Sequence, residues 1–303
     1  MRPIQADQRL WTAEAIAEAE AAVDPSAAQR LADAGAAPRA KRNTKRNSHM
    51  TMLTRLHEIY RSAGLQPLTG HSTKHMHDWA DAPFTRFYNG EGIVGCAGLS
   101  LFEIMFVEHL GTYIDPRSVL VIGNAHGWST LALALTFPKA KILALDPDQV
   151  GVELTNDLAR KNKLSVDAVV GTSPDSVKPA CAEHLNGAVD FVLIDAIHTN
   201  DALKTDFFAS AEVASKDAFY LFHDVINWKM VDGFKSMQAA PGLGGRILTR
   251  TPSGMGVLHG EISPELAQYL DCFSDNPQLL MAYRTMVQQA FAGDVFGEAL
   301  AAL

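Results

Sequence analysis

The sequence predicts an α/β protein built on a doubly wound, mostly parallel sheet of seven strands, with helical additions at both ends. Three observations indicate this fold. Short apolar runs alternate with helical segments from Ser118 onward, which is the pattern of βαβ units. The first run stops at a glycine and restarts as a helix, and an acidic residue ends the second run. Two short segments around Pro252 then close the pattern as a hairpin.

The first five predicted strands are apolar and rich in β-branched residues, as expected of strands that are buried on both faces of a sheet. They span residues 119–123, 141–146, 167–171, 190–195 and 218–224. Helical segments separate them at residues 129–137, 150–162, 173–185 and 200–214. A helix at 227–237 follows, and the hairpin strands are expected at 246–251 and 254–260. Because helices connect the first five strands, that part of the sheet is expected to be parallel.

The segments on either side of this pattern are less regular. Residues 1–92 are expected to form a helical extension that ends in a loop, residues 93–260 the α/β domain, and residues 261–303 a helical tail. Residues 63–92 show no clear periodicity, whereas 93–113 hold an apolar helix. We expect His71, His75 and His77 to belong to a loop that contacts substrate, with a metal site as the less favoured alternative. The cationic residues of the extension are interpreted as a solvated helix face rather than an anion site; they are Lys41, Arg42, Lys45 and Arg46.

The composition is that of a globular protein rather than a membrane or nucleic-acid-binding one. Hydrophobic residues make up 47% and charged residues 20% of the 303 residues. A formal net charge of -8 disfavours a nucleic-acid partner, and no apolar run is long enough to cross a bilayer. The three cysteines, Cys96, Cys181 and Cys272, are far apart and indicate free thiols in a reducing compartment. A cytoplasmic location is therefore expected.

The turn after the first predicted strand indicates a bound nucleoside. Gly123 ends the strand, Gly127 follows four residues later, and Ser129 opens the helix, so that backbone comes close to a ligand at a helix N-terminus. Asp146 ends the second strand, where nucleotide-binding α/β folds place a carboxylate on ribose hydroxyls. The middle glycine of a dinucleotide motif, which admits a pyrophosphate, is replaced in the stretch Asn124-Ala125-His126. S-adenosylmethionine is therefore the expected cofactor, although an ordinary strand-to-helix turn has the same glycines.

Five segments in this order resemble the class I S-adenosylmethionine-dependent methyltransferases, and within them the catechol O-methyltransferase-like and bacterial small-molecule O-methyltransferase group. The segments are VLVIGNAHGWSTLALA, LALDPD, VVGTSPDSV, DFVLIDAIHTND and LFHDVIN, and the resemblance covers roughly residues 93–260. It implies a Rossmann-like methyltransferase fold in which residues 93–260 form the cofactor-binding catalytic domain. The cofactor-binding residues that it implies are Gly123, Asn124, Ala125, Gly127, Trp128, Ser129, Asp146, Thr172, Ser173 and Asp195. Trp128 packs either on the cofactor or on the first helix, and packing is the commoner fate of a tryptophan.

The resemblance also suggests where methyl transfer takes place. Asp195 ends the fourth strand, and His198 stands where the family has a lysine that acts as the general base. An imidazole suits that role because its ordinary pKa lies near neutrality. Asp195 and Asp224 end neighbouring strands and are candidate ligands of Mg²⁺. The metal-dependent members have an asparagine where this chain has Val225, so that His223 or Asn227 would have to complete the set.

The predicted activity is transfer of a methyl group from S-adenosylmethionine to a small-molecule acceptor, at a hydroxyl oxygen. A metal-independent methyltransferase acting on nitrogen is an alternative, because a neutral amine needs neither a metal nor a strong base. A Rossmann-type nicotinamide oxidoreductase and a non-catalytic cofactor-binding protein are competing hypotheses from different functional classes. The Phe-, Leu- and Met-rich tail from Ser263 onward is interpreted as a homodimer contact or a cap on the substrate pocket, with a structural helix pair as an equal alternative.

Overall fold

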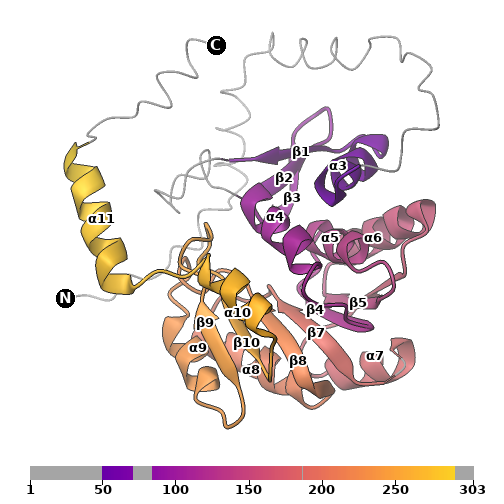
Figure 1. The fold of residues 1–303 in the computed structure, drawn as a ribbon. Helices are drawn as coiled ribbons and strands as arrows, with labels where there is room; N and C mark the ends of the chain where they lie inside the picture. The colour runs from indigo at the N-terminus through magenta and orange to yellow at the C-terminus, as the bar shows by residue number, and fades with distance from the viewer. Residues whose placement is uncertain (1–49, 71–83, 186, 291–303) are drawn as a thin grey trace, which may run out of the picture.

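The computed structural model describes residues 50–70, 84–185 and 187–290 (Figure 1). The helices predicted before residue 50, the cationic group at 41–46 and the three histidines at 71–77 lie outside the described residues.

The main sheet has seven strands in the order β6-β5-β4-β7-β8-β10-β9. The strands are β4 (Ser118–Ile122), β5 (Lys141–Asp146), β6 (Val166–Val170), β7 (Val189–Ile194), β8 (Ala214–Phe222), β9 (Gly244–Ile247) and β10 (Gly256–His259). Neighbouring strands are parallel from β6 to β8, whereas β10 pairs antiparallel with both β8 and β9. The predicted fold, a mostly parallel sheet closed by a hairpin, is confirmed.

Helices cover both faces of this sheet, which explains why its central strands are apolar throughout. Along β4, Val119 and Val121 face one hydrophobic core, whereas Leu120 and Ile122 face the other, because side chains alternate along a strand. The first core includes residues of α5 (Trp128–Thr136) and α6 (Gln149–Asn162). The second includes residues of α7 (Val177–His184), α8 (Asn200–Ala211) and α9 (Val231–Gln238).

Strand β4 lies at the point where the chain changes direction across the sheet. It pairs with β5 on one side and with β7 on the other, and the later strands continue outward from each of them. Ligands of open α/β sheets bind beyond the carboxyl ends of the strands at such a switch point. The topology therefore places Gly123, Asp146 and Asp195, which end or follow β4, β5 and β7, at one binding edge.

A second, smaller sheet precedes the main one and differs from the sequence-based expectation. It consists of β1 (Gln66–Thr69), β2 (Thr85–Tyr88) and β3 (Ile93–Gly98), all antiparallel. The helix predicted at 93–113 is therefore shorter, α4 (Leu101–Leu110), and another helix, α3 (Met52–Ser62), precedes the small sheet. Two of these strands have only four residues, which is too short for an alternating pattern to stand out. Both α3 and α4 contact α5 and so bring the small sheet to the carboxyl edge (Figure 1).

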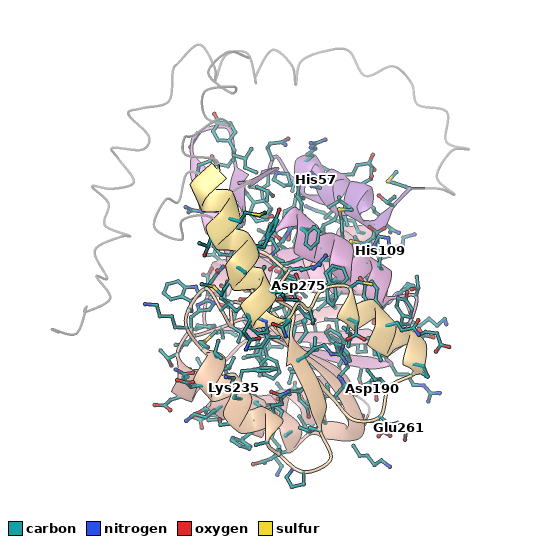
Figure 2. All side chains as sticks on the ribbon, turned by 60° about the vertical axis from the view of Figure 1, so that its left-hand side comes forward. His57, His109, Asp190, Lys235, Glu261 and Asp275 are labelled. Carbon is teal, nitrogen blue, oxygen red and sulfur yellow. The ribbon has the colours of Figure 1, made fainter. Side chains whose placement is uncertain are left out.

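The described part of the tail, up to residue 290, is helical as expected, with α10 (Pro264–Asp271) and α11 (Pro277–Ala290). Asp275, just before α11, accepts two hydrogen bonds from the Arg250 guanidinium, at 2.6 and 2.7 Å. Figures 1 and 2 show α11 on the outside of the molecule, with Asp275 at its base in Figure 2. Among the described residues, no helix is both long and apolar enough to cross a membrane. The division into three parts at residues 93 and 261 stays a prediction.

Candidate functional site

The turn between β4 and α5 is shaped by glycines that admit no side chain. Gly123 has φ +96°, and a Cβ there would lie 1.9 Å from the carbonyl oxygen of Asp195. Gly127 has φ +80°, and its Cβ would meet the Thr155 hydroxyl at 2.3 Å. Positive φ and these close approaches leave glycine as the residue that fits without strain. The turn can therefore lie flat against β7 and α6 and leave its outer side open.

Asn124 fixes the same turn from inside. Its buried side-chain amide donates to Thr155 Oγ1 at 2.8 Å and accepts from the Thr130 hydroxyl at 2.8 Å. The side-chain amide is thus engaged within the protein, and the cofactor contact predicted for Asn124 stays a prediction. The sequence does not reveal this role, because Thr155 is about 30 residues away on another helix.

Asp146 connects the turn to the end of β5. Its Oδ2 accepts a hydrogen bond of 2.7 Å from the Ala125 N–H, and its Oδ1 accepts one of 2.8 Å from the Asp148 N–H. Each carboxylate oxygen has a second lone pair, so the group can still accept bonds from ribose hydroxyls. Ala125 has φ +43°, unusual for a residue other than glycine, and such conformations concentrate at functional sites.

A cavity of about 440 Å³ lies beyond these residues, within the range of small-molecule pockets. Most of the predicted cofactor residues line it, namely Gly123, Asn124, Ala125, Trp128, Ser129, Asp146, Thr172, Ser173 and Asp195. His198 lines the cavity as well, whereas Gly127 and Asp224 are not part of its wall. His126 of the glycine turn lines the cavity too, and the structure adds Phe87 and the buried Asp206, which were not predicted from the sequence.

Trp128 is held by packing rather than left free for a ligand. Its indole Nε1 donates to the Leu99 carbonyl oxygen at 3.0 Å, and its ring packs beside Tyr60 and Phe87. The Tyr60 hydroxyl donates to the His126 carbonyl oxygen at 2.8 Å, so that α3 also supports the glycine turn. Of the two roles predicted for Trp128, packing is therefore the main one, although the residue still contributes to the cavity wall.

Two carboxylates and two imidazoles meet at the carboxyl ends of β7 and β8. One side-chain donor atom of each of Asp195, His198, His223 and Asp224 lies within 4.8 Å of those of the other three. His198 Nε2 is 3.1 Å from Asp224 Oδ2 and 3.6 Å from Asp195 Oδ1. His223 Nδ1 is 3.0 Å from Asp195 Oδ1 and 3.4 Å from Asp224 Oδ2. The structure thus brings together the residues that were predicted for catalysis and metal binding, and we call them the Asp–His cluster.

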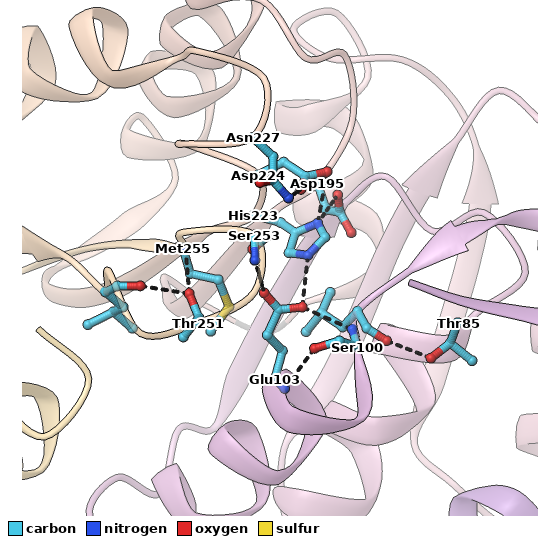
Figure 3. Close-up of polar contacts among 12 residues, drawn as sticks. Thr85, Ser100, Glu103, Asp195, His223, Asp224, Asn227, Thr251, Ser253 and Met255 are labelled. Atoms are coloured by element: carbon cyan, nitrogen blue, oxygen red, sulfur yellow. Dashed lines mark hydrogen bonds and ion pairs between the residues drawn. The ribbon is translucent and has the colours of Figure 1, made fainter. Parts of the chain in front are cut away.

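Glu103 extends the Asp–His cluster into the protein interior (Figure 3). This residue of α4 is fully buried, and its Oε2 lies 3.2 Å from Nε2 of the almost equally buried His223. The backbone N–H of Ser100 and that of Ser253 also donate to the Glu103 carboxylate, at 2.9 and 3.0 Å. Glu103 was not predicted from the sequence, because a glutamate in the first turn of an apolar helix has the pattern of a capping residue. It is one here, since its carboxylate caps Ser100 in a capping box.

The charges of the Asp–His cluster shift one another's pKa values. Burial lowers the pKa of His198, but its ion pairs with Asp195 and Asp224 outweigh burial and raise it to about 9. The same balance holds the pKa of His223 well above its usual value. Burial favours neutral carboxyl groups, yet the two histidines lower the pKa of Asp195 and Asp224. The carboxylates are therefore ionised and require positive charge beside them.

The Asp–His cluster offers donor atoms for the divalent cation that the resemblance implies. Carboxylate oxygens of Asp195 and Asp224 face a common space in the Asp–His cluster, as ligands of one ion must. Val225, which replaces the usual third ligand, is fully buried among apolar side chains and offers no donor. The amide of Asn227 lies near Asp224, with its Nδ2 3.4 Å from Oδ1. The two carboxylates, with waters, fit a divalent cation, and the imidazoles of His198 and His223 add nitrogen donors beside them.

The fold and the cavity are those of an α/β protein with a pocket at the switch point of its sheet, and the comparison with family models points to a methyltransferase. Residues 120–225, about a third of the chain, match the family model described as a methyltransferase domain. This part of the chain is therefore similar to a methyltransferase domain, in agreement with the resemblance of its motifs to the class I S-adenosylmethionine-dependent methyltransferases. No curated protein matches the sequence.

Solved structures with a similar arrangement are distant in sequence. One is the O-methyltransferase from Bacillus cereus in complex with S-adenosylhomocysteine, with 15% identity, 77% of this chain and 97% of that chain covered, and a TM-score of 0.47. Another is the O-methyltransferase TomG from Streptomyces achromogenes, involved in tomaymycin synthesis and in complex with S-adenosylmethionine. It has 14% identity, with 78% and 99% of the two chains covered and a TM-score of 0.49.

Proposed function

We propose that this protein transfers a methyl group from S-adenosylmethionine to a hydroxyl oxygen of a small-molecule acceptor. The observation that carries the proposal is the position of the Asp–His cluster, two residues of which, Asp195 and His198, line the wall of the cavity behind the glycine turn. A cofactor in that cavity and an acceptor on the cluster would meet at one place. Such proximity supplies several kcal/mol of the rate enhancement of a two-substrate reaction.

The cavity suits an adenosyl cofactor without a pyrophosphate. The backbone at Gly123 and Ala125 would lie along the amino-acid part, and the Asp146 carboxylate would accept bonds from the ribose hydroxyls. The turn that contains Thr172 and Ser173, together with α8, encloses the far end, where we place the adenine. When bound, S-adenosylmethionine supplies an electrophilic methyl group, which leaves sulfur for the acceptor oxygen.

His198 is the proposed general base. Its Nε2 is buried and, among the described residues, makes no aligned hydrogen bond, although both carboxylates lie near it. Its ring stacks on Trp228 with 5.1 Å between centroids, so its orientation is fixed. We propose that Nε2 accepts the hydroxyl proton as the acceptor oxygen bonds to the methyl carbon. Asp195 and Asp224 orient the imidazole and stabilise the positive charge that it gains.

A divalent cation held by Asp195 and Asp224 would supply the positive charge that protonated His198 provides in the free protein, and would leave the imidazole unprotonated. The acceptor, the cytoplasmic location and the homodimer also remain proposals.

An acceptor screen with S-adenosylmethionine labelled on the methyl carbon tests the proposed methyl transfer. Hydroxyl compounds and matched amines should be compared, with and without chelator. Labelled ethers as products would support it, whereas label transferred to amines alone would favour N-methylation.

A further inference from the structure

The orientation of His223 determines what the Asp–His cluster can bind. Its ring is 2% exposed, and its Nε2 faces the Glu103 carboxylate at 3.2 Å. Because the hydrogen-bond partner of one ring nitrogen fixes the state of the other, Nε2 carries a proton and Nδ1 is left to face Asp195 and Asp224. Three electron-rich atoms then face one another: Nδ1 lies 3.0 Å from Asp195 Oδ1 and 3.4 Å from Asp224 Oδ2. Such an arrangement needs a cation between the atoms, either a second proton on His223 or a metal ion.

The separations also suit a metal ion. Two donor atoms that are each about 2.1 Å from one ion lie about 3.0 Å apart at a right angle and about 3.4 Å apart at a tetrahedral angle. An ion would attract His223 Nδ1 and the two carboxylate oxygens at once.

The partner of His223 is also typical of a metal centre. A histidine that binds a metal usually donates its other N–H to a carboxylate, which orients the ring and raises its basicity. Glu103 is placed for that role, because its Oε2 and Oε1 are fixed by the backbone of Ser100 and Ser253. It comes from α4, so the small N-terminal layer of the structure supports a residue at the end of β8.

We propose that Asp195, His223 and Asp224 bind one divalent transition-metal ion, such as Zn²⁺, Mn²⁺, Fe²⁺ or Co²⁺, in preference to Mg²⁺, and that Glu103 orients His223 for this task. An imidazole ligand favours these ions, whereas Mg²⁺ favours oxygen ligands alone. His223 thereby takes the place of the ligand that is lost at Val225. The inference rests on the proposed function in treating the Asp–His cluster as the acceptor side of the active site. His198 remains the base beside the ion.

Cobalt binding to the full-length protein tests the proposal without measuring activity. After the protein is stripped with a chelator, titration with Co²⁺ should produce one equivalent of visible d–d absorption, which a hundredfold excess of Mg²⁺ does not remove. Glu103→Gln should weaken Co²⁺ binding about 10–100-fold, since that is the usual effect of losing such a partner. His223→Asn should weaken it further. Glu108→Gln is the matched control, because Glu108 lies on the same helix and accepts instead from the Met52 N–H.

Three results would overturn the proposal: no Co²⁺ absorption at millimolar metal, displacement by an equal concentration of Mg²⁺, or unchanged Co²⁺ affinity in both Glu103→Gln and His223→Asn. Thermal unfolding of each variant should be measured alongside, and a metal loss counts only for variants that still unfold cooperatively. Calorimetric titration with S-adenosylmethionine separates the metal inference from the proposed function. If the cofactor binds and cobalt does not, the metal inference fails alone, whereas absent cofactor binding contradicts the proposed function.

Discussion

A single imidazole carries the chemical step of the proposed reaction. Replacing it, as in His198→Ala, should lower kcat about 10²–10⁴-fold, the usual contribution of a general base. The dissociation constant for S-adenosylmethionine should change little, because the proposed cofactor contacts are on other residues. Kinetics with the best acceptor and calorimetry with the cofactor measure the two effects. His184→Ala is the control, because His184 bonds to Asp167 of the edge strand β6 rather than to the Asp–His cluster. Unchanged kcat in His198→Ala would exclude the imidazole as base.

A second residue, Gly123, is required by the close approach of two strands. In Gly123→Ala the new Cβ would collide with the Asp195 carbonyl, so we expect lower stability and loss of cofactor binding. Gly90→Ala is a closely matched control, because Gly90 has φ +99° but a Cβ there would have no atom within 4 Å. That variant should lose about 1–2 kcal/mol from strain alone and bind the cofactor normally. Equal losses in both variants, measured by denaturant unfolding, would contradict the role assigned to the close approach.

At the scale of elements, α8 places a buried carboxyl group beside the cavity. Asp206 is 5% exposed, and burial raises its pKa, although the nearby Ser173 hydroxyl opposes the shift. Because the folded state favours the neutral acid, the contribution of Asp206 to stability is present below pH 3.8, the ordinary value, and is lost as pH rises through the raised pKa.

Asp206→Asn removes this titration and keeps the shape of the side chain. The melting temperature of the variant relative to the wild type should therefore be more favourable at pH 7 than at pH 4. Melting curves at both values measure the difference, with the exposed Asp232→Asn as the control that shows no such trend. A difference that is independent of pH would show that Asp206 ionises normally in the folded protein.

The same scale shows what the sequence could predict. Strands β4 to β8 and the helices between them were found because each has a local signal, either a β-branched run or helical periodicity. The glycine turn and Asp146 were found because nucleotide-binding α/β folds place the glycines and the acidic residue at a set spacing along the chain. The short strands β1 and β2 were missed because neither contains a run of apolar β-branched residues. Glu103 was missed because its contact with His223 joins residues 120 positions apart.

For the molecule as a whole, the exposed helix α11 predicts self-association. Leu279, Tyr283 and Met286 lie at i, i+4 and i+7 on one face and are 71%, 60% and 58% exposed. An apolar stripe of this kind on an outer helix marks an interaction surface, and we expect the same helix of a second copy to cover it. Light scattering after gel filtration should therefore give twice 32.8 kDa.

Charges placed on this stripe should separate the two copies. The double variant Leu279→Glu with Met286→Glu is expected to be monomeric and to keep its affinity for the cofactor, since α11 does not contribute to the cavity. Gln278→Glu, on another face of α11, should remain dimeric. A dimer with a micromolar dissociation constant persists at about 0.1 mM protein. A wild-type protein that is monomeric at all concentrations up to that value would therefore contradict the assembly.

Whether the carboxyl edge of the sheet binds an adenosyl cofactor is measured most directly by calorimetry. The protein, freed of any ligand retained from purification, should be titrated with S-adenosylmethionine, S-adenosylhomocysteine and NAD⁺. We predict one site per chain for each of the first two ligands and no heat of binding for NAD⁺. The absence of binding by both adenosyl compounds, or a preference for NAD⁺, would contradict the assignment of this cavity.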